Sequence, residues 1–409
     1  MKFWFHLLLS GLFLTSCSLG EKEGDDIEDI RKARDESRNS GSVPAIEWVN
    51  VAVWPGPFNK PVDVMVGFDR LIYVADELAG TVYQFDENGK QLGSWSGLKS
   101  PTKLGMDRRL NLFVAGRFDT TINNRVYNLP AVFYLDMTSS RQVLTTTTRI
   151  QKRIIHPYYF NPSGSGLSDA EKVSFAGIAV FGDNSFYLAR RGPVNSLATA
   201  LGGYDNTIVQ FDKNQNYIGH LSSQLEPSNG AGLKSIVNPI SLTSYAAPPQ
   251  SNGISQSKDF IFGIEGQSFY RVQGLTLTSE DLYDYDRKFL SQDTSKTKRF
   301  MYGFVRRSGN LESRFASPAD IAVAADKNQF ILVVDNKLDS VFQFTASGEE
   351  GVPVFGRKHV ITSFGGTGSG VKQFRNPSGI AYGTLKLYVA DTGNRRIMVY
   401  KLSSDITGN

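Results

Sequence analysis

The sequence ends in a repeat unit, Phe374 to Leu402, that constrains the fold more than any other stretch. Three short runs rich in β-branched and aromatic residues make up this unit, separated by Gly-Thr and by Asp-Thr-Gly-Asn. Such runs and separators are typical of antiparallel strands joined by tight turns. A single meander of this size cannot bury its apolar face, so we expect the unit to recur.

Weaker copies of the unit occur along the rest of the chain. They begin near Lys60, Ser100, Phe175, Asn238 and Ser317. The spacing from the start of the first run to the end of the second is nearly constant, and only an insertion between Tyr245 and Lys258 interrupts it in the fourth copy. Six such units, in a chain with 39 glycines and 16 prolines, predict an all-β, six-bladed β-propeller.

The last unit resembles the NHL repeat family in three segments, 376–380 (NPSGI), 388–391 (YVAD) and 391–397 (DTGNRRI). The resemblance covers roughly residues 60–402; it is strong at both ends and weak in the middle, where the second to fourth units lack the aspartate. It implies a closed ring of blades. Because the last unit ends on its third strand, we expect residues 46–53 to supply the missing outer strand of the sixth blade and so to close the ring.

The first 16 residues form a predicted signal peptide, because the apolar run from Phe3 to Leu14 is shorter than the roughly 20 residues that span a bilayer. Residues 14–17 (LTSC) resemble a bacterial lipobox, which implies acylation of Cys17, for example with palmitate. The alternative is a free thiol beside an ordinary cleavage site. Residues 17–45 are charged and read as a flexible tether, 46–403 as the propeller, and 404–409 as a C-terminal tail.

The predicted localisation is therefore the cell envelope, to which a lipid on the chain would attach the protein. Ser18 after the cysteine favours the outer membrane over the inner one, if the cell has both. With a formal net charge of +4 over 409 residues, the chain has too small a basic excess to indicate nucleic acid as a partner. An envelope protein or glycan is the expected partner.

Long insertions in the second and third units predict a binding surface on one face of the ring, called the top face below. This face carries the turns between second and third strands and the connections between blades. The insertions are 117–129, 153–174 and 192–205. The candidate binding residues are Arg117, Tyr158, Tyr159, Arg190 and Arg191, because guanidinium groups and aromatic rings hold carboxylates, phosphates and sugars. The alternative is that the arginines pair with acids of their own loops.

Two kinds of aspartate also stand out. Asp76, Asp335 and Asp391 follow second strands, where an aspartate ordinarily accepts hydrogen bonds from turn amides. Asp63 and Asp320 begin inner strands and should face the channel, where they are weak candidates for Ca²⁺ ligands. The equivalent positions of the other units hold no acid; they are Lys103, Gly177, Ser241 and Gly379.

The sequence contains few of the residue patterns that are typical of catalytic sites. The mature chain has three histidines, His156, His220 and His359, in an insertion and at the rim, where they cannot converge on a zinc ion. No serine elbow or paired cysteine replaces them. We therefore expect a binding or scaffold protein without a resident cofactor, and keep as the alternative a calcium-dependent hydrolase or lyase, similar to lactonases of this architecture, that uses the channel.

Overall fold

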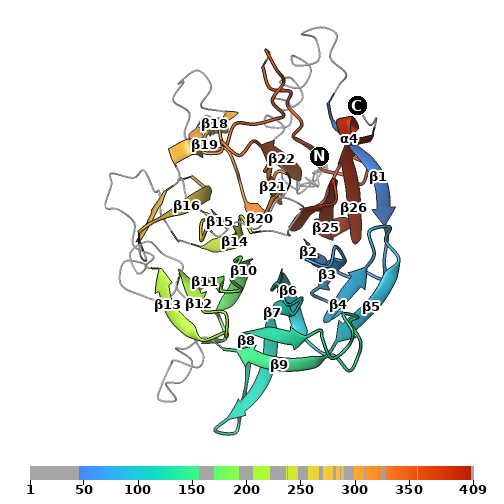
Figure 1. Cartoon of the computed structure of the whole chain (residues 1–409), viewed down its shortest axis with the longest axis vertical. Helices are drawn as coiled ribbons and strands as arrows, with labels where there is room; N and C mark the ends of the chain where they lie inside the picture. Colours follow the sequence, from blue (N-terminus) through green and yellow to red (C-terminus); the bar gives the residue numbers. More distant parts are fainter. Residues whose placement is uncertain are drawn as a thin grey trace, which may run out of the picture.

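The computed structural model describes most of the chain after the tether. The described residues are 46–155, 170–192, 206–221, 236, 238–246, 257–266, 270–279, 282–285, 287–289, 299–307, 310–324, 326, 328–356 and 358–406. They form six four-stranded antiparallel sheets arranged as blades around a central channel (Figure 1). The all-β, six-bladed prediction is confirmed.

Each of the first three blades runs from an inner strand to an outer strand in chain order. The first blade consists of β2 (Pro61–Val66), β3 (Ile72–Asp76), β4 (Thr81–Phe85) and β5 (Gln91–Ser96). The second consists of β6 (Lys99–Met106), β7 (Leu112–Ile122), β8 (Arg125–Asp136) and β9 (Arg149–Ile154). The third consists of β10 (Ser174–Val180), β11 (Phe186–Arg191), β12 (Thr207–Phe211) and β13 (Tyr217–Leu221).

The remaining blades keep this order until the ring closes. The fourth blade consists of β14 (Pro239–Ser244), β15 (Phe260–Ile264), β16 (Val272–Ser279) and β17 (Leu282–Tyr285). A 3-10 helix η2 (Arg287–Phe289) and a hairpin of β18 (Phe304–Arg307) and β19 (Asn310–Ser313) follow. The fifth consists of β20 (Pro318–Val323), β21 (Ile331–Asp335), β22 (Ser340–Phe344) and β23 (Phe364–Gly365). The sixth contains β24 (Gly379–Gly383), β25 (Lys386–Asp391) and β26 (Arg396–Leu402), with the 3-10 helix η4 (Thr392–Asn394) and the short helix α4 (Ser403–Ile406) beside them.

The ring is closed by β1 (Trp48–Trp54), which is the outer strand of the sixth blade. It pairs antiparallel with β26, from Trp48 opposite Leu402 to Trp54 opposite Ile397. In Figure 1 the blue first strand lies beside the dark red last strand. The closure predicted from residues 46–53 is therefore confirmed.

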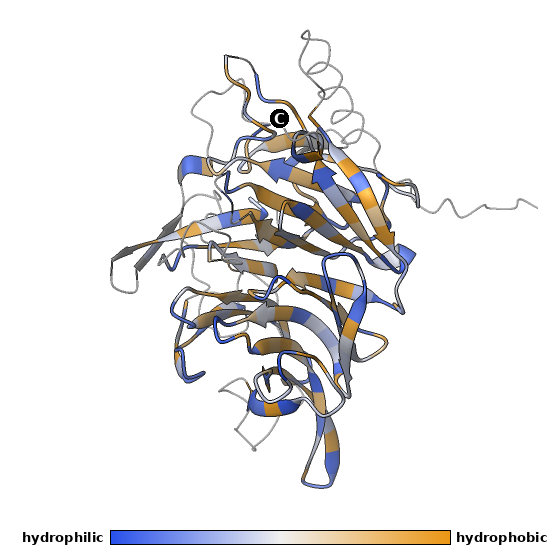
Figure 2. Ribbon diagram, turned by 45° about the vertical axis from the view of Figure 1, so that its right-hand side comes forward, coloured by the Kyte–Doolittle hydropathy of each residue, from blue (hydrophilic) through white to orange (hydrophobic). Residues whose placement is uncertain are grey.

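The core lies between neighbouring blades. All five residues of β3 are buried, as are all five of β21, because each second strand is covered on both faces by adjacent sheets. Outer strands are covered on one face only, so β1 alternates between buried and more exposed residues. Figure 2 shows hydrophobic residues running through the packed strands, with hydrophilic residues concentrated at the turns.

One prediction about the top face is wrong in its local structure. The insertion 117–129 is not a loop; β7 and β8 continue as a hairpin whose tip is Asn123 and Asn124, both with positive φ. Asparagine tolerates this left-handed backbone better than most residues, so the two asparagines allow a tight two-residue turn. Among the described residues, no helix is long and apolar enough to cross a membrane.

Candidate active site in the central channel

The central channel contains a cavity of about 120 Å³ that is partly open to solvent. Its walls come from the inner strands of all six blades and the turns that follow them, and most of the lining side chains are apolar. The lining begins with Asp63, Lys103 and Asp320, near the starts of β2, β6 and β20. It continues to Phe68 and Tyr382, near the ends of inner strands. The cavity thus extends from these charged residues away from the top face.

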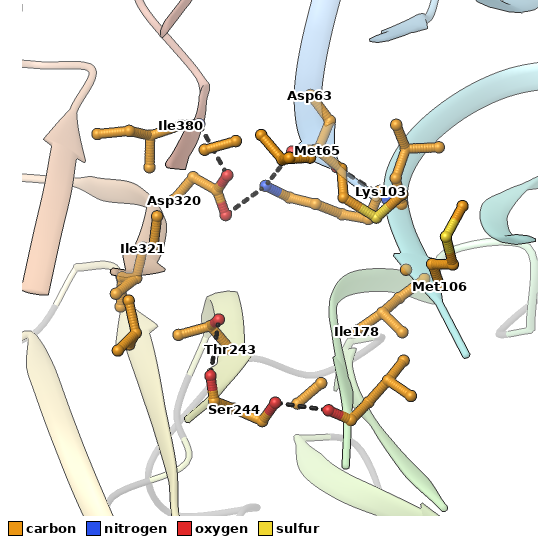
Figure 3. A pocket seen from close by; sticks show the side chains of 18 of the residues that line it. Asp63, Met65, Lys103, Met106, Ile178, Thr243, Ser244, Asp320, Ile321 and Ile380 are labelled. Carbon is orange, nitrogen blue, oxygen red and sulfur yellow. Dashed lines mark hydrogen bonds and ion pairs between the residues drawn. The ribbon is translucent and has the colours of Figure 1, made fainter. Parts of the chain in front are cut away.

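Three charged side chains form a cluster at this end of the cavity (Figure 3). The ammonium Nζ of Lys103 lies 3.0 Å from Oδ1 of Asp320 and 3.5 Å from Oδ1 of Asp63. Lys103 belongs to the second blade and Asp320 to the fifth, so the lysine reaches across the ring. All three residues are at least nine-tenths buried.

Backbone amides fix the two carboxylates of this cluster. Oδ2 of Asp63 accepts a hydrogen bond from the N–H of Leu104 at 2.8 Å, and Oδ2 of Asp320 accepts one from Ile380 at 3.0 Å. Each bond joins an inner strand to the next blade, so the carboxylates also help to hold the blades together. Their second oxygens remain directed at Lys103.

The charge balance of the cluster makes Asp63 a proton-exchanging group. Burial raises the pKa of Asp63 to about 8, against the opposing effect of the Lys103 ammonium; the Asp320 carboxylate adds to the rise, and the Leu104 amide lowers it. For Lys103, burial alone would lower the pKa, but the carboxylates of Asp320 and Asp63 together raise it. The lysine therefore stays charged, while Asp63 exchanges a proton near neutral pH.

This arrangement does not fit the calcium site considered from the sequence. Asp63 and Asp320 do come together, but the ammonium of Lys103 lies where a cation would sit, and a calcium ion needs six to eight oxygen ligands. The other inner-strand positions bring no acid: Gly177 and Gly379 lack side chains, and Ser241 donates its hydroxyl to the carbonyl of Pro318 at 3.1 Å. In the described part of the chain, no group of three His, Cys, Asp or Glu residues could hold a metal ion.

The three arginines predicted for the top face make contacts within the chain. The guanidinium of Arg117 donates to the carbonyl oxygens of Asn128, Glu171 and Val173, and so fixes the β7–β8 hairpin to the segment before β10. This agrees with the alternative of intramolecular pairing, although the partners are mostly carbonyl oxygens and the loop acid Asp119 contacts Lys99 and Asn128 instead.

The other two arginines lie in the third blade. Arg190 is buried and donates to the carbonyl of Gly192 at 2.7 Å. Arg191 is partly exposed and pairs with Glu265 at 3.2 Å. Glu265 also pairs with Lys337, at 3.4 Å, so this part of the top face carries a chain of ion pairs between three blades. Tyr158, Tyr159 and the lipidation candidate Cys17 lie outside the described residues.

The two histidines that the structure describes, His220 and His359, lie on different blades. His220 lies on the outer strand β13 beside the hydroxyl of Tyr217, at 2.9 Å. His359 faces Glu349 at 3.8 Å on the rim of the fifth blade, and His156 lies outside the described residues. A zinc site built from these side chains is therefore not supported.

The residue that sequence reasoning missed is Lys103. In the sequence analysis Lys103 appears only as one of the inner-strand positions that hold no acid. In the structure it forms a charged cluster with Asp63 and Asp320. The signal was present: three charged residues occupy equivalent inner-strand positions of three repeats, where channel-facing side chains must either pair or line a cavity.

The chain resembles known proteins in its fold and not in its sequence. No protein-family model matches the chain, and no curated protein matches its sequence. Among solved structures, a luciferin-regenerating enzyme matches with a TM-score of 0.50 and 10% identity, over 87% of this chain and 95% of that one. A gluconolactonase from Xanthomonas campestris matches with a TM-score of 0.50 and 9% identity, over 88% and 96%.

A third solved structure, a protein of unknown function from Bacteroides thetaiotaomicron, is 14% identical with a TM-score of 0.46, over 90% of this chain and 74% of that one. At 9 and 10% identity, the likeness to the two enzymes with a TM-score of 0.50 shows a shared six-bladed propeller fold.

Proposed function

We propose that the central channel binds a small, mainly apolar molecule and catalyses a hydrolase- or lyase-type reaction on it. The observation that carries this proposal is the buried Asp63–Lys103–Asp320 cluster at the end of an apolar cavity. The similar structures include a gluconolactonase and a luciferin-regenerating enzyme, which supports a channel enzyme better than a passive scaffold.

The chemistry follows from the charges of the cluster. Asp63 has a pKa of about 8, so it can take up and return a proton near neutral pH, as general acid–base catalysis requires. The Lys103 ammonium lies between the carboxyl groups of Asp63 and Asp320 and holds both in position at the end of the cavity. Since Lys103 occupies the cation position, we propose that the reaction does not depend on calcium.

A panel of small esters and lactones, followed by proton release in a weakly buffered solution, tests the proposal. We expect turnover by the wild-type protein, unchanged by EDTA, and a loss of at least about 100-fold in Asp63→Asn, within the range that general acid–base groups contribute. Arg191→Gln, which changes a top-face ion pair, serves as the control and should keep wild-type activity. Equal activity of the Asp63→Asn and wild-type proteins would refute a role for the cluster.

We also propose that the propeller is attached to the cell envelope through a lipid on Cys17, with the outer membrane as the favoured site, where an envelope protein or glycan could still bind the top face. The supporting observation is the lipobox-like sequence 14–17. Metabolic labelling with a clickable palmitate analogue should label the wild-type protein and not Cys17→Ser. A labelled Cys17→Ser protein would place the modification elsewhere.

A further inference from the structure

The cavity is charged at one end and mainly apolar along the rest of its length. At one end lie the two carboxylates and the ammonium; from there the walls are formed by aliphatic and thioether side chains such as Met65, Met106 and Ile178 (Figure 3). Methionine side chains are flexible and adapt to ligands of different shape. The cavity is therefore suited to an elongated molecule with an apolar body and one polar end.

The hydrogen-bonding capacity of the charged end determines which polar group it accepts. Asp63 and Asp320 each have one oxygen bonded to a backbone amide and one facing Lys103. Each carboxylate oxygen has two lone pairs, so both carboxylates can accept a further hydrogen bond. Lys103 is the only cation of the cluster, and two carboxylates already neutralise its charge.

The inner-strand positions equivalent to Asp63, Lys103 and Asp320 in the other three blades add no charge to the cluster. Gly177 and Gly379 have no side chain, and a Cβ at either position would lie within 3 Å of the neighbouring blade's backbone. Ser241 is bonded to a carbonyl group. Above a pH of about 8, where Asp63 is ionised, the cluster carries a formal charge of −1, which attracts a cation or a hydrogen-bond donor and repels an anion.

We propose that the substrate is an amphipathic molecule whose leading group is a primary amine or a hydroxyl, bound at Asp63 and Asp320, with its apolar part along the channel. This inference rests on the proposed function, since it names the substrate class of the same site. A carboxylate-led molecule is disfavoured, because it would approach two carboxylates without a free cation to meet it.

Access to this site is predicted from the face opposite the top face. The lining residues farthest from the cluster, Phe68, Ala246 and Tyr382, lie where inner strands turn into second strands. Thr243 projects into the cavity between this end and the cluster, and its hydroxyl makes one long contact, 3.5 Å, with the carbonyl of Ser244 (Figure 3). A large side chain at Thr243 should therefore fill the channel without touching the charged cluster.

Calorimetric titration with n-hexylamine, 1-hexanol and hexanoate tests the inference on the full folded protein. We expect hexylamine to bind at least about 10-fold more tightly than hexanoate, a difference of about 1.4 kcal/mol. Thr243→Phe should abolish binding of all three, while Arg191→Gln, a change outside the channel, is the control and should leave it unchanged. Asp320→Asn should weaken hexylamine about 10-fold and change hexanol much less.

Three outcomes would overturn the inference: hexanoate binding as tightly as hexylamine, binding that survives Thr243→Phe, or no binding of any probe at millimolar concentration. If anionic substrates are turned over and Asp63→Asn abolishes that turnover, the substrate class is wrong while the proposed function stands. If no probe binds and no substrate of the panel is turned over, both fail.

Discussion

Buried aspartates occur in two regions of this ring, and they have different partners. On the top face, Asp335 accepts four backbone N–H groups, from Ala316, Ser317, Lys337 and Leu338, at 2.7 to 3.1 Å. In the channel, Asp63 accepts one backbone N–H and directs its other oxygen at a lysine. Burial raises the pKa of both carboxyl groups. Burial and residue type alone therefore do not distinguish a structural carboxylate from a reactive one.

What distinguishes them is whether their hydrogen-bonding capacity is used and whether a cavity adjoins them. The top-face aspartates join the end of a second strand to the segment that enters the same blade: Asp76 accepts the N–H groups of Asn59 and Lys60, and Asp391 that of Arg375. None of these top-face aspartates lines the channel cavity. The channel aspartates retain free lone pairs beside an open volume, which is the arrangement of a binding site.

The largest expected effect is on the top face. Asp335→Ala leaves four backbone N–H groups without their acceptor, and at about 1 kcal/mol for each bond the free energy of unfolding should fall by about 4 kcal/mol. Urea denaturation measures it. Asp335→Asn, which keeps one carbonyl oxygen, should lose less than Asp335→Ala. A loss below about 1 kcal/mol would show that the turn does not depend on this carboxylate.

The next effect is in the channel. Lys103→Met removes the ammonium that faces both buried carboxyl groups, which should cost about 3 kcal/mol of unfolding free energy at pH 8. The loss should shrink at pH 5, where Asp63 is protonated and Lys103 has one negative partner fewer. Lys103→Arg keeps the charge and is the matched control. If Lys103→Met were as stable as Lys103→Arg at both pH values, the ion pairs of Lys103 would not contribute to the free energy of unfolding.

A smaller effect is expected at the β7–β8 hairpin. Arg117→Ala removes the donor that ties the hairpin to the segment before β10, with an expected loss of about 2 kcal/mol in thermal or chemical unfolding. Arg125→Ala is the control in the same hairpin, because its pair with Glu171 is long, at 3.5 Å, and its side chain is 61% exposed. Equal losses in both variants would contradict the assigned role of Arg117.

A further effect is a dependence of stability on pH that Asp63 causes. The folded-state pKa of Asp63 is about 8, above its unfolded value, so the folded state holds this proton more tightly. Its contribution to stability is therefore complete at low pH and declines as pH rises from about 4 to 8. Asp63→Asn lacks this ionisation, and its stability relative to wild type should increase from pH 5 to pH 8. A constant difference over this range would mean that the pKa of Asp63 is not raised.

The sequence was sufficient for the fold because repeat spacing and strand patterns are local properties. The six copies of the repeat, with a nearly constant spacing from the first run to the end of the second, predicted the number of blades. Residues 46–53 could then be assigned as the closing strand by counting strands. The role of Asp76, Asp335 and Asp391 followed from ordinary turn chemistry.

The site was predicted only in part, since it depends on distances across the ring. Asp63 and Asp320 were identified as channel residues, but the reach of the Lys103 side chain to the opposite blade is not visible in any single repeat. The β7–β8 hairpin was mistaken for a loop because its residues carry no clear alternation, and pairing between distant parts of one insertion is a tertiary property.

The position of β1 has a consequence for biosynthesis. Residues 48–54 leave the ribosome before any blade exists, yet their partner, 396–402, is made only after the first five blades. Until then β1 has no edge to join, and the five complete blades form an open arc. The ring can therefore close only after residues 396–402 have been synthesised, and a nascent chain must keep β1 from pairing elsewhere.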